Sequence, residues 1–226
     1  RLKAWLLIRR IPQLSVLLIL VTIFIILSIS TKAFLTGSNL VNILRQASSY
    51  YIMAIGMTFV LILGGIDLSV GSVACLAGTM VAGFLVHFRL PTSVSFILGM
   101  LIGVAAGLIN GLVVSKLRLP SFIATLAMMS SARGLSLIYS GGYPIVDFPQ
   151  SAVFLGRGQV LGIPLTVIFF AVIAVLAWFV LNKTRLGRHI YAIGASEECA
   201  KLSGIHIDAV KVAVYAISGL TAAITG

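Results

Sequence analysis

Residues 92–115 read TSVSFILGMLIGVAAGLINGLVVS, an apolar run without a charged side chain. A helix needs about 20 mostly apolar residues to cross the hydrocarbon core of a bilayer, so this run is long enough to span a membrane. Every fourth residue is small, and residues four apart form one continuous row on a helix surface. Small residues let neighbouring helix backbones approach closely in lipid. The stretch therefore predicts a membrane helix within a dense bundle, with its small row at Ser95, Gly99, Gly103, Gly107, Gly111 and Ser115.

A second small row lies in the apolar run 70–88, at Gly71, Cys75, Thr79 and Gly83. Two interpretations of such rows are open. The favoured one is close packing between helices, and the alternative is that these helices slide past one another or line a pore.

The composition extends the same conclusion to the whole chain. Its 226 residues are 60% hydrophobic and 9% charged, whereas soluble domains carry about 25% charged residues. We predict an all-α, polytopic membrane bundle that forms a single transmembrane domain over 1–226. A seventh span begins near Ala209 and the chain stops within it, without an initiator Met, so we expect a longer protein. The complete spans are expected at 12–30, 47–64, 70–88, 92–115, 119–140 and 164–182.

The net charge of +11 comes from 16 Lys and Arg against 5 Asp and Glu. Most of the basic residues lie in short loops between apolar runs. That distribution follows the positive-inside rule and argues against a nucleic-acid partner. The asymmetry favours a cytoplasmic N-terminus, which places the segment 183–208 in the cytoplasm and the segment 141–163 outside.

Motifs for catalysis are absent from the sequence. It contains no GxxxxGK[ST] phosphate loop, no HExxH and no GxSxG. Cys75 and Cys199 are expected to be free thiols, and the three histidines lie in separate loops or span ends. We therefore expect no catalytic residue, metal or cofactor. An ion-coupled secondary transporter is the rival function, but Asp67 is the single acid inside the spans that could serve it.

Asp67 lies in the stretch GGIDLSVGS, residues 64–72. Glycines end helices and Asp or Ser begins them, so the stretch predicts a turn or a re-entrant break between the second and third spans. The favoured role of Asp67 or Ser69 is to accept backbone N–H groups at the start of the third span. A role in the transport path or gate and a role in ion coupling are the alternatives.

Two further polar residues lie inside the spans. Asn110 favours an interhelical hydrogen bond, with a ligand contact as the alternative. Arg133 has two open interpretations: it marks a helix break and bonds to free carbonyls, or it faces an aqueous cavity.

The segment 183–208 carries the signals of a short helix. Ser196 with Glu197 and Glu198 predicts a capped helix start, and Gly204 predicts its end. A helix of about two turns is not stable alone, so something must pack on it. It packs either against this protein's own helix ends or, as favoured, into a groove of a cytoplasmic partner.

Four stretches together resemble the membrane-spanning permease subunits of bacterial ABC importers for monosaccharides, the ribose, xylose and galactoside type. They are GGIDLSVGS at 64–72, INGLVVSKLRLPSFIATLAMM at 109–129, RGLSLIYSGG at 133–142 and TRLGRHIYAIGASEECAKLSGI at 184–205. The likeness covers the chain from end to end, and the family continues past Gly226. Cys199 is one departure, because the family pattern has Ala there.

The resemblance implies a permease in the bacterial inner membrane that conducts a monosaccharide and is no enzyme itself. Its implied partners are a cytoplasmic ATPase subunit, an extracytoplasmic sugar-binding protein and a second permease copy. The implied ATPase-coupling segment comprises Glu197, Glu198, Cys199, Ala200, Leu202, Ser203 and Gly204. The candidates for the translocation path or gate are Asp67, Ser69, Asn110, Phe122 and Thr125.

Overall fold

The computed structural model describes residues 12–226, so the basic N-terminal residues that contribute to the expected orientation lie outside the described part. The chain divides into two compact units, Arg1–Leu44 and Arg45–Gly226. The described part of the first unit contains α2 (Pro12–Ser30), which matches the first expected span, and the beginning of α3 (Gly37–Ile62). In this unit Phe24 and Phe34 pack edge to face, with ring centroids 5.3 Å apart.

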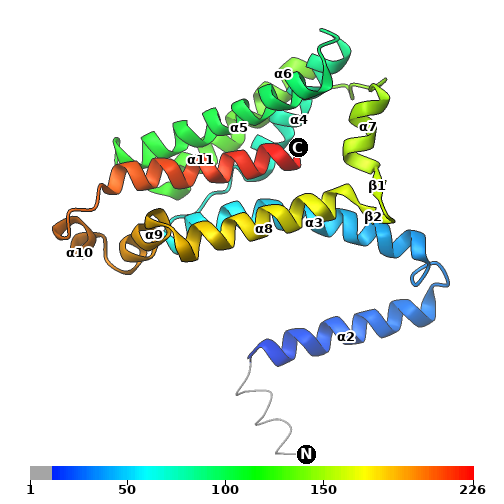
Figure 1. Cartoon of the computed structure of the whole chain (residues 1–226), viewed down its shortest axis with the longest axis horizontal. Helices are drawn as coiled ribbons and strands as arrows, with labels where there is room; N and C mark the ends of the chain where they lie inside the picture. The colour runs from blue at the N-terminus through cyan, green and yellow to red at the C-terminus, as the bar shows by residue number, and fades with distance from the viewer. Residues whose placement is uncertain (1–11) are drawn as a thin grey trace, which may run out of the picture. The chain divides into compact units, whose positions relative to one another are not determined.

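The second unit holds the remaining helices (Figure 1). The expected third, fourth, fifth and sixth spans are α4 (Val70–Val86), α5 (Thr92–Ser115), α6 (Ser121–Ser140) and α8 (Leu165–Lys183), and the seventh is α11 (Ile207–Thr225). The helices α5, α6, α8 and α11 are long and apolar enough to cross a membrane, and α4 is a shorter apolar helix. The all-α prediction is confirmed.

One helix boundary differs from the expectation, and one helix was not expected. The helix α3 begins at Gly37, well before residue 47. The expected span was limited to apolar residues, whereas the helix itself also includes the polar residues around Asn39. The segment 183–208 contains a helix that was not expected, α9 (Arg185–Ala195), ahead of the expected short helix α10 (Glu197–Leu202). The signal for α9 was present: apolar residues recur on one helical face at Leu186, Ile190 and Ile193.

The segment 141–163 forms a connection with little regular structure. It contains α7 (Gln150–Arg157) and the start of a two-residue antiparallel hairpin, β1 (Gln159–Val160) with β2 (Ile163–Pro164). Leu161 and Gly162 at the hairpin turn both have positive φ, at 52° and 81°, as a tight two-residue hairpin requires.

The small row of α5 packs against α11, and the two helices lie side by side in Figure 1. A Cβ on Gly107 would collide with the carbonyl oxygen of Tyr215, and one on Gly111 would lie 2.6 Å from the Cα of Val212. The backbones therefore touch directly along this row. The packing interpretation of the glycine row is confirmed, and its partner lies within the same chain.

The small row of α4 packs mainly against α6. The hydroxyls of Thr79 and Ser136 lie 2.8 Å apart, and a Cβ on Gly83 would collide with the ring of Tyr139. The contact between α4 and α6 is thus partly polar, whereas the contact between α5 and α11 is made by backbone atoms.

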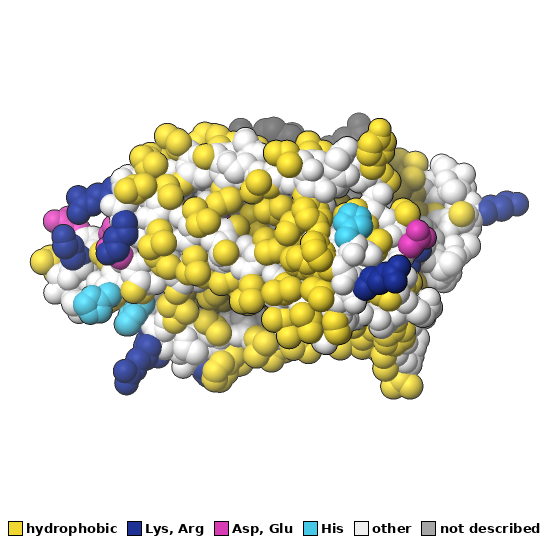
Figure 2. Space-filling view, turned by 90° about the horizontal axis from the view of Figure 1, so that it is seen from above, with side chains coloured by type: hydrophobic (Ala, Val, Ile, Leu, Met, Phe, Trp, Pro, Cys, Tyr) yellow, Lys and Arg dark blue, Asp and Glu magenta, His cyan; other side chains and the backbone are white. Residues whose placement is uncertain are grey.

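The surface is apolar where the spans expose it. In Figure 2 hydrophobic side chains cover the middle of the visible face, and charged side chains gather toward its two ends. The helix α8 has no buried residue, and it exposes large apolar side chains such as Leu176, Trp178 and Phe179. Such faces suit contact with lipid.

Candidate translocation and coupling sites

Asp67 is buried, with 2% of its surface exposed, and its carboxylate accepts three hydrogen bonds. The backbone N–H of Ser69 donates to Oδ1 at 2.9 Å, and the Ser69 hydroxyl donates to the same oxygen at 2.6 Å. The hydroxyl of Ser218, in α11, donates to Oδ2 at 2.7 Å. The carboxylate is therefore held from two separate parts of the chain.

Asn110 extends this network to α5, because its Nδ2 donates to the Ser69 hydroxyl at 3.0 Å. All four side chains are buried. We call this set the Asp67 network: Asp67, Ser69, Asn110 and Ser218. It joins the turn before α4 to α5 and α11, so Asn110 acts as the interhelical partner that the sequence favoured.

The position of Asp67 comes from the turn that precedes it. The helix α3 ends at Ile62, and Gly64 adopts a φ of 85°, which redirects the chain. Ile66 then bonds to the start of α6: its N–H donates to the Ser121 hydroxyl at 3.1 Å, and its carbonyl accepts from Thr125 Oγ1 at 3.3 Å. This turn is the connection between spans that the sequence predicted.

The capping arrangement differs in detail from the expectation. Ser69 is the N-cap residue of α4, but its side chain makes no cap hydrogen bond. Instead Asp67 accepts the N–H of Ser69 itself and the Ser69 hydroxyl donates back to Asp67. Asp67 thus stabilises the turn that leads into α4 rather than the first helical N–H groups.

A buried carboxylate is costly unless its charge is compensated. Within residues 12–226 no Lys or Arg forms an ion pair with Asp67, so hydrogen bonds provide the compensation. Hydrogen bonds to an ionised acceptor are about twice as strong as neutral ones, and three of them satisfy both carboxylate oxygens. The sequence did not single out Ser218, because a serine in an apolar run carries no signal of its distant partner.

The other two candidates for the translocation path, Thr125 and Phe122, are not members of the Asp67 network. Thr125 is buried beside the turn and donates to the Ser121 carbonyl at 2.8 Å. Phe122 is 51% exposed on the same helix, and its apolar side chain cannot join the hydrogen-bond network. The structure therefore brings Asp67, Ser69 and Asn110 together, places Thr125 next to their turn and leaves Phe122 outside.

Arg133 does not break a helix, because α6 is continuous from Ser121 to Ser140. That interpretation of Arg133 is wrong. Its side chain lines a cavity of about 360 Å³ between α4, α6 and the loop after α6.

The short helix expected after Ser196 is present as α10, and its role in coupling stays a prediction. The Ser196 hydroxyl accepts the N–H of Cys199 at 3.2 Å, which caps its start, and Gly204 with a φ of 79° follows its end. Glu197 and Glu198 lie in its first turn, where the helix dipole favours negative charge.

The two faces of α10 differ. Ala200 is 3% exposed and joins the apolar cluster that contains Ile190, Val210 and Val214. Leu202 is 84% exposed, and Glu198, Cys199 and Ser203 are exposed as well. One face of the helix therefore packs on the protein itself, as the first of the two alternatives expects. The other face is exposed and is free to bind a cytoplasmic partner, as the second alternative requires.

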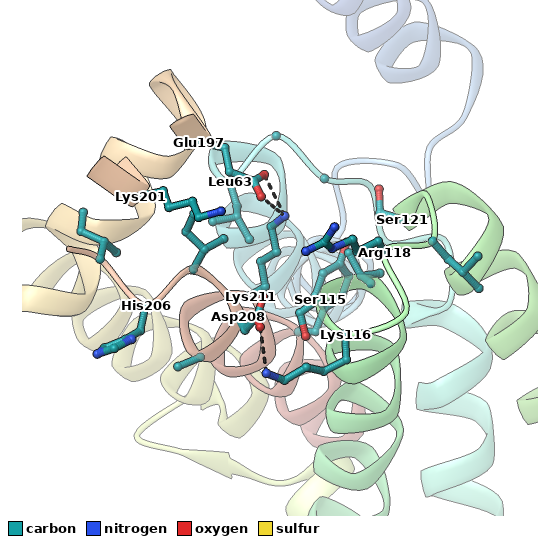
Figure 3. Close-up of a pocket in the computed structure, with 18 of the residues that line it drawn as sticks. Leu63, Ser115, Lys116, Arg118, Ser121, Glu197, Lys201, His206, Asp208 and Lys211 are labelled. Atoms are coloured by element: carbon teal, nitrogen blue, oxygen red, sulfur yellow. Dashed lines mark hydrogen bonds and ion pairs between the residues drawn. The ribbon is translucent and has the colours of Figure 1, made fainter. Parts of the chain in front are cut away.

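A second cavity, of about 1110 Å³, opens beside α10 (Figure 3). Two ion pairs join its walls: Lys211 Nζ lies 2.8 Å from a carboxylate oxygen of Glu197, and Lys116 Nζ lies 2.8 Å from one of Asp208. Lys211 is 18% exposed, so its pair with Glu197 is the more shielded one, and it ties α10 to α11. Arg118 and Lys201 add positive charge to the walls.

Comparison with known proteins gives a consistent result. Residues 39–226 match the model of a family described as branched-chain amino acid transport system / permease component. The ribose import permease protein of Escherichia coli (strain K12) is 40% identical over 228 residues, which are 99% of this chain and 69% of that protein.

Two other relatives extend this pattern. The ribose import permease protein of Bacillus subtilis (strain 168) is 43% identical over 204 residues, 89% of this chain and 63% of that protein. The D-allose transport system permease protein of Escherichia coli (strain K12) is 36% identical over 211 residues, 93% of this chain and 64% of that protein. The chain thus spans about two thirds of the length of these relatives. No solved structure matches it.

Proposed function

Because the chain belongs to the family of branched-chain amino acid transport system permease components, we propose that it is the membrane-spanning subunit of an ATP-driven importer for a monosaccharide. The observation that carries this proposal is the 40% identity to a ribose import permease over 99% of the chain. The relatives are transporter subunits rather than enzymes, and the protein is a multi-pass protein of the inner membrane. ATP hydrolysis then takes place on a separate subunit.

The chemistry of the spans favours a neutral solute over an amino acid. A zwitterionic amino acid needs an anionic and a cationic partner in its site. The buried acid Asp67 already accepts three hydrogen bonds within the protein. Hydroxyl and amide groups dominate the other polar positions of the spans, and they suit the hydroxyls of a sugar.

The same network weakens the ion-coupled alternative. An ion-coupled transporter needs an acid that binds and releases a cation or proton during each cycle. Both oxygens of Asp67 accept hydrogen bonds from Ser69 and Ser218, which favours a fixed structural part for this carboxylate.

The ATPase subunit is proposed to dock on the open face of α10, at Glu198, Cys199, Leu202 and Ser203. Ala200 on the opposite face transmits the movement, because it packs in the same cluster as Val210 and Val214 of α11. About one turn beyond Val214, Ser218 holds Asp67. A displacement of α10 thus reaches the Asp67 network through α11, and the ion pair between Glu197 and Lys211 stiffens the same connection.

The remaining parts of the proposal concern assembly. The N-terminus lies in the cytoplasm, and α10 lies there with it. An extracytoplasmic binding protein delivers the sugar at the opposite end, near the segment 141–163. Two copies of the permease enclose one path, and Asp67, Ser69, Asn110, Phe122 and Thr125 stay candidates for its wall or gate. The glycine row of α5 is already occupied by α11, so the contact between copies uses another face.

Reconstitution tests the proposed function. The full-length permease is placed in liposomes with its ATPase and binding protein, and uptake of D-ribose and D-allose is measured. We expect uptake that requires ATP and the binding protein. Uptake driven by a proton or sodium gradient without ATP would instead support the secondary transporter.

A further inference from the structure

The cavity of about 360 Å³ next to Arg133 has a polar wall inside membrane-spanning helices. It lies between α4 and α6, and residues 142–145 of the following loop also line it. Its volume is within the range of about 300–1,000 Å³ that small-molecule sites occupy. We call it the Arg133 cavity, and its polar lining residues are Cys75, Thr79, Arg133, Ser136, Ser140 and Tyr143.

Arg133 carries a charge in the span Ser121–Ser140. Placing an arginine at the centre of a membrane helix costs about 2.5–3.5 kcal/mol on insertion scales, so such residues face water or a partner. Among the residues that the structure describes, no carboxylate forms an ion pair with Arg133. Its Nη1 donates to Cys75 Sγ at 3.8 Å, a weak contact that leaves most of its five N–H donors available.

The opposite wall supplies both donors and acceptors. The hydroxyls of Thr79 and Ser136 lie 2.8 Å apart, and Thr79 donates to the carbonyl of Cys75 at 2.7 Å. Each hydroxyl keeps lone pairs that can accept from a ligand. No Asp or Glu among residues 12–226 lines the cavity. This combination suits a neutral ligand with several hydroxyl groups, whose oxygens accept from the guanidinium while its hydroxyls donate to the serine and threonine.

The Arg133 cavity and the cavity beside α10 lie at opposite ends of α6. The first is lined by Ser140 and the residues after it, and the second by Ser121 at the start of the helix. The Arg133 cavity therefore lies at the end of the spans farther from the coupling helix.

We propose that the Arg133 cavity is the first binding site for the monosaccharide after it leaves the binding protein, with Arg133, Thr79 and Ser136 as its hydrogen-bonding groups. This assignment rests on the proposed importer function and adds the place where the sugar enters. It predicts that the cavity is open to water and that a bound sugar covers Cys75.

The two natural cysteines allow a direct test. The substitution Cys199→Ser is made in the full-length permease, and any cysteine outside residues 1–226 is also replaced by serine, so that Cys75 is the single thiol. This variant is assembled with the ATPase and the binding protein. A charged, membrane-impermeant methanethiosulfonate reagent is added, and the labelling rate of Cys75 is measured with and without D-ribose or D-allose. We expect labelling without sugar and about tenfold slower labelling when the transported sugar is present, as for a site at about 90% occupancy.

A matched control separates the cavity from the lipid-facing surface. In the background Cys75→Ala with Cys199→Ser, the variant Leu101→Cys places a thiol on an apolar, 56% exposed position of α5. The charged reagent should leave this thiol unlabelled, because lipid excludes it. Labelling of Cys75 that is no faster than labelling at position 101 would overturn the proposal.

Arg133→Gln tests the ligand contact. Losing one charged donor should raise the half-saturating sugar concentration for uptake about tenfold. At the same sugar concentration the protection of Cys75 should then fall from about tenfold to about twofold, while labelling without sugar persists. Arg89→Gln, at an exposed loop arginine, should change neither. Normal uptake without protection of Cys75 in the parent protein overturns the cavity assignment alone. Absence of ATP-dependent uptake of any sugar by the parent, combined with protection of Cys75 by an amino acid, overturns the importer assignment together with it.

Discussion

The hydroxyl of Ser218 lies 2.7 Å from the carboxylate of Asp67, although the two residues are separated by 151 positions in the chain. This bond connects the turn before α4 to α11, the helix that also packs along the glycine row of α5 and is ion-paired to the proposed coupling helix α10. Asp67 is therefore a structural junction between helices that the proposed mechanism requires to move together.

Replacing Asp67 distinguishes its hydrogen bonding from its charge. Asp67→Asn keeps an oxygen that accepts from Ser69, and the Ser218 hydroxyl can rotate to accept from the new amide. We expect this variant to retain much of the transport. Asp67→Ala leaves buried hydroxyls without their acceptor and should lower the free energy of unfolding by about 1–3 kcal/mol. Thermal unfolding in detergent and uptake in liposomes measure the two effects.

If Asp67→Asn is as inactive as Asp67→Ala while it is produced and assembled normally, the negative charge itself is required. The hydrogen-bonding account would then be wrong, and ion coupling or a gating role for the charge would become the better explanation.

A double-mutant cycle tests the bond between Asp67 and Ser218. Ser218→Ala removes one donor, and its effect should depend on whether Asp67 is present. We expect an interaction free energy of about 0.5–3 kcal/mol between Ser218→Ala and Asp67→Ala in thermal unfolding. Additive effects would show that the two side chains do not stabilise one another. Ser203→Ala, in the exposed part of the segment after α10, serves as an uncoupled control.

The glycine row of α5 predicts a different pattern of sensitivity. Gly107→Ala places a methyl group against the Tyr215 carbonyl, so α5 and α11 must separate, at a cost of about 1–3 kcal/mol. Gly134→Ala, in the middle of α6, meets open space and should be neutral or stabilising by up to about 1 kcal/mol. Unfolding in detergent compares the two variants. Equal effects would contradict the close packing of α5 on α11.

Local patterns in the sequence were sufficient for most of the long apolar helices and for the α5 packing row. The apolar runs predicted the spans, and the repeat of small residues from Ser95 to Ser115 predicted a close helix contact. The sequence could not identify α11 as the partner, because the row shows that something packs closely but not what does. The polar beginning of α3 and the amphipathic α9 were missed because both depart from the pattern of uniformly apolar spans.

The candidate site was predictable only in part. Asp67, Ser69 and Asn110 stood out as polar residues in apolar surroundings, and they do form one network. Ser218 is common in type and lies far along the chain, so its role depended on the three-dimensional arrangement. Arg133 stood out as a charged residue inside an apolar span. The choice between a helix break and a cavity required the three-dimensional structure, in which α6 continues through Arg133.

The proposed coupling helix, α10, gives the last prediction. Ala200→Trp adds a bulky side chain to α10, and overpacking costs on the order of 1–3 kcal/mol. In the structure Ala200 is buried in the same apolar cluster as Ile190 and Val214, so this change overpacks the protein's own core and should lower its thermal stability. Leu202 is 84% exposed and leaves that core untouched, so Leu202→Asp should reduce binding of the ATPase without changing stability.

Pull-down with the ATPase and thermal unfolding in detergent separate the two variants. Leu161→Asp, at a 97% exposed leucine in the hairpin turn, is the matched control and should keep full ATPase binding. Undiminished binding by Leu202→Asp would place the docking surface elsewhere on the permease. Loss of binding by Ala200→Trp at unchanged stability would show that the ATPase contacts the face of α10 that the structure packs inward.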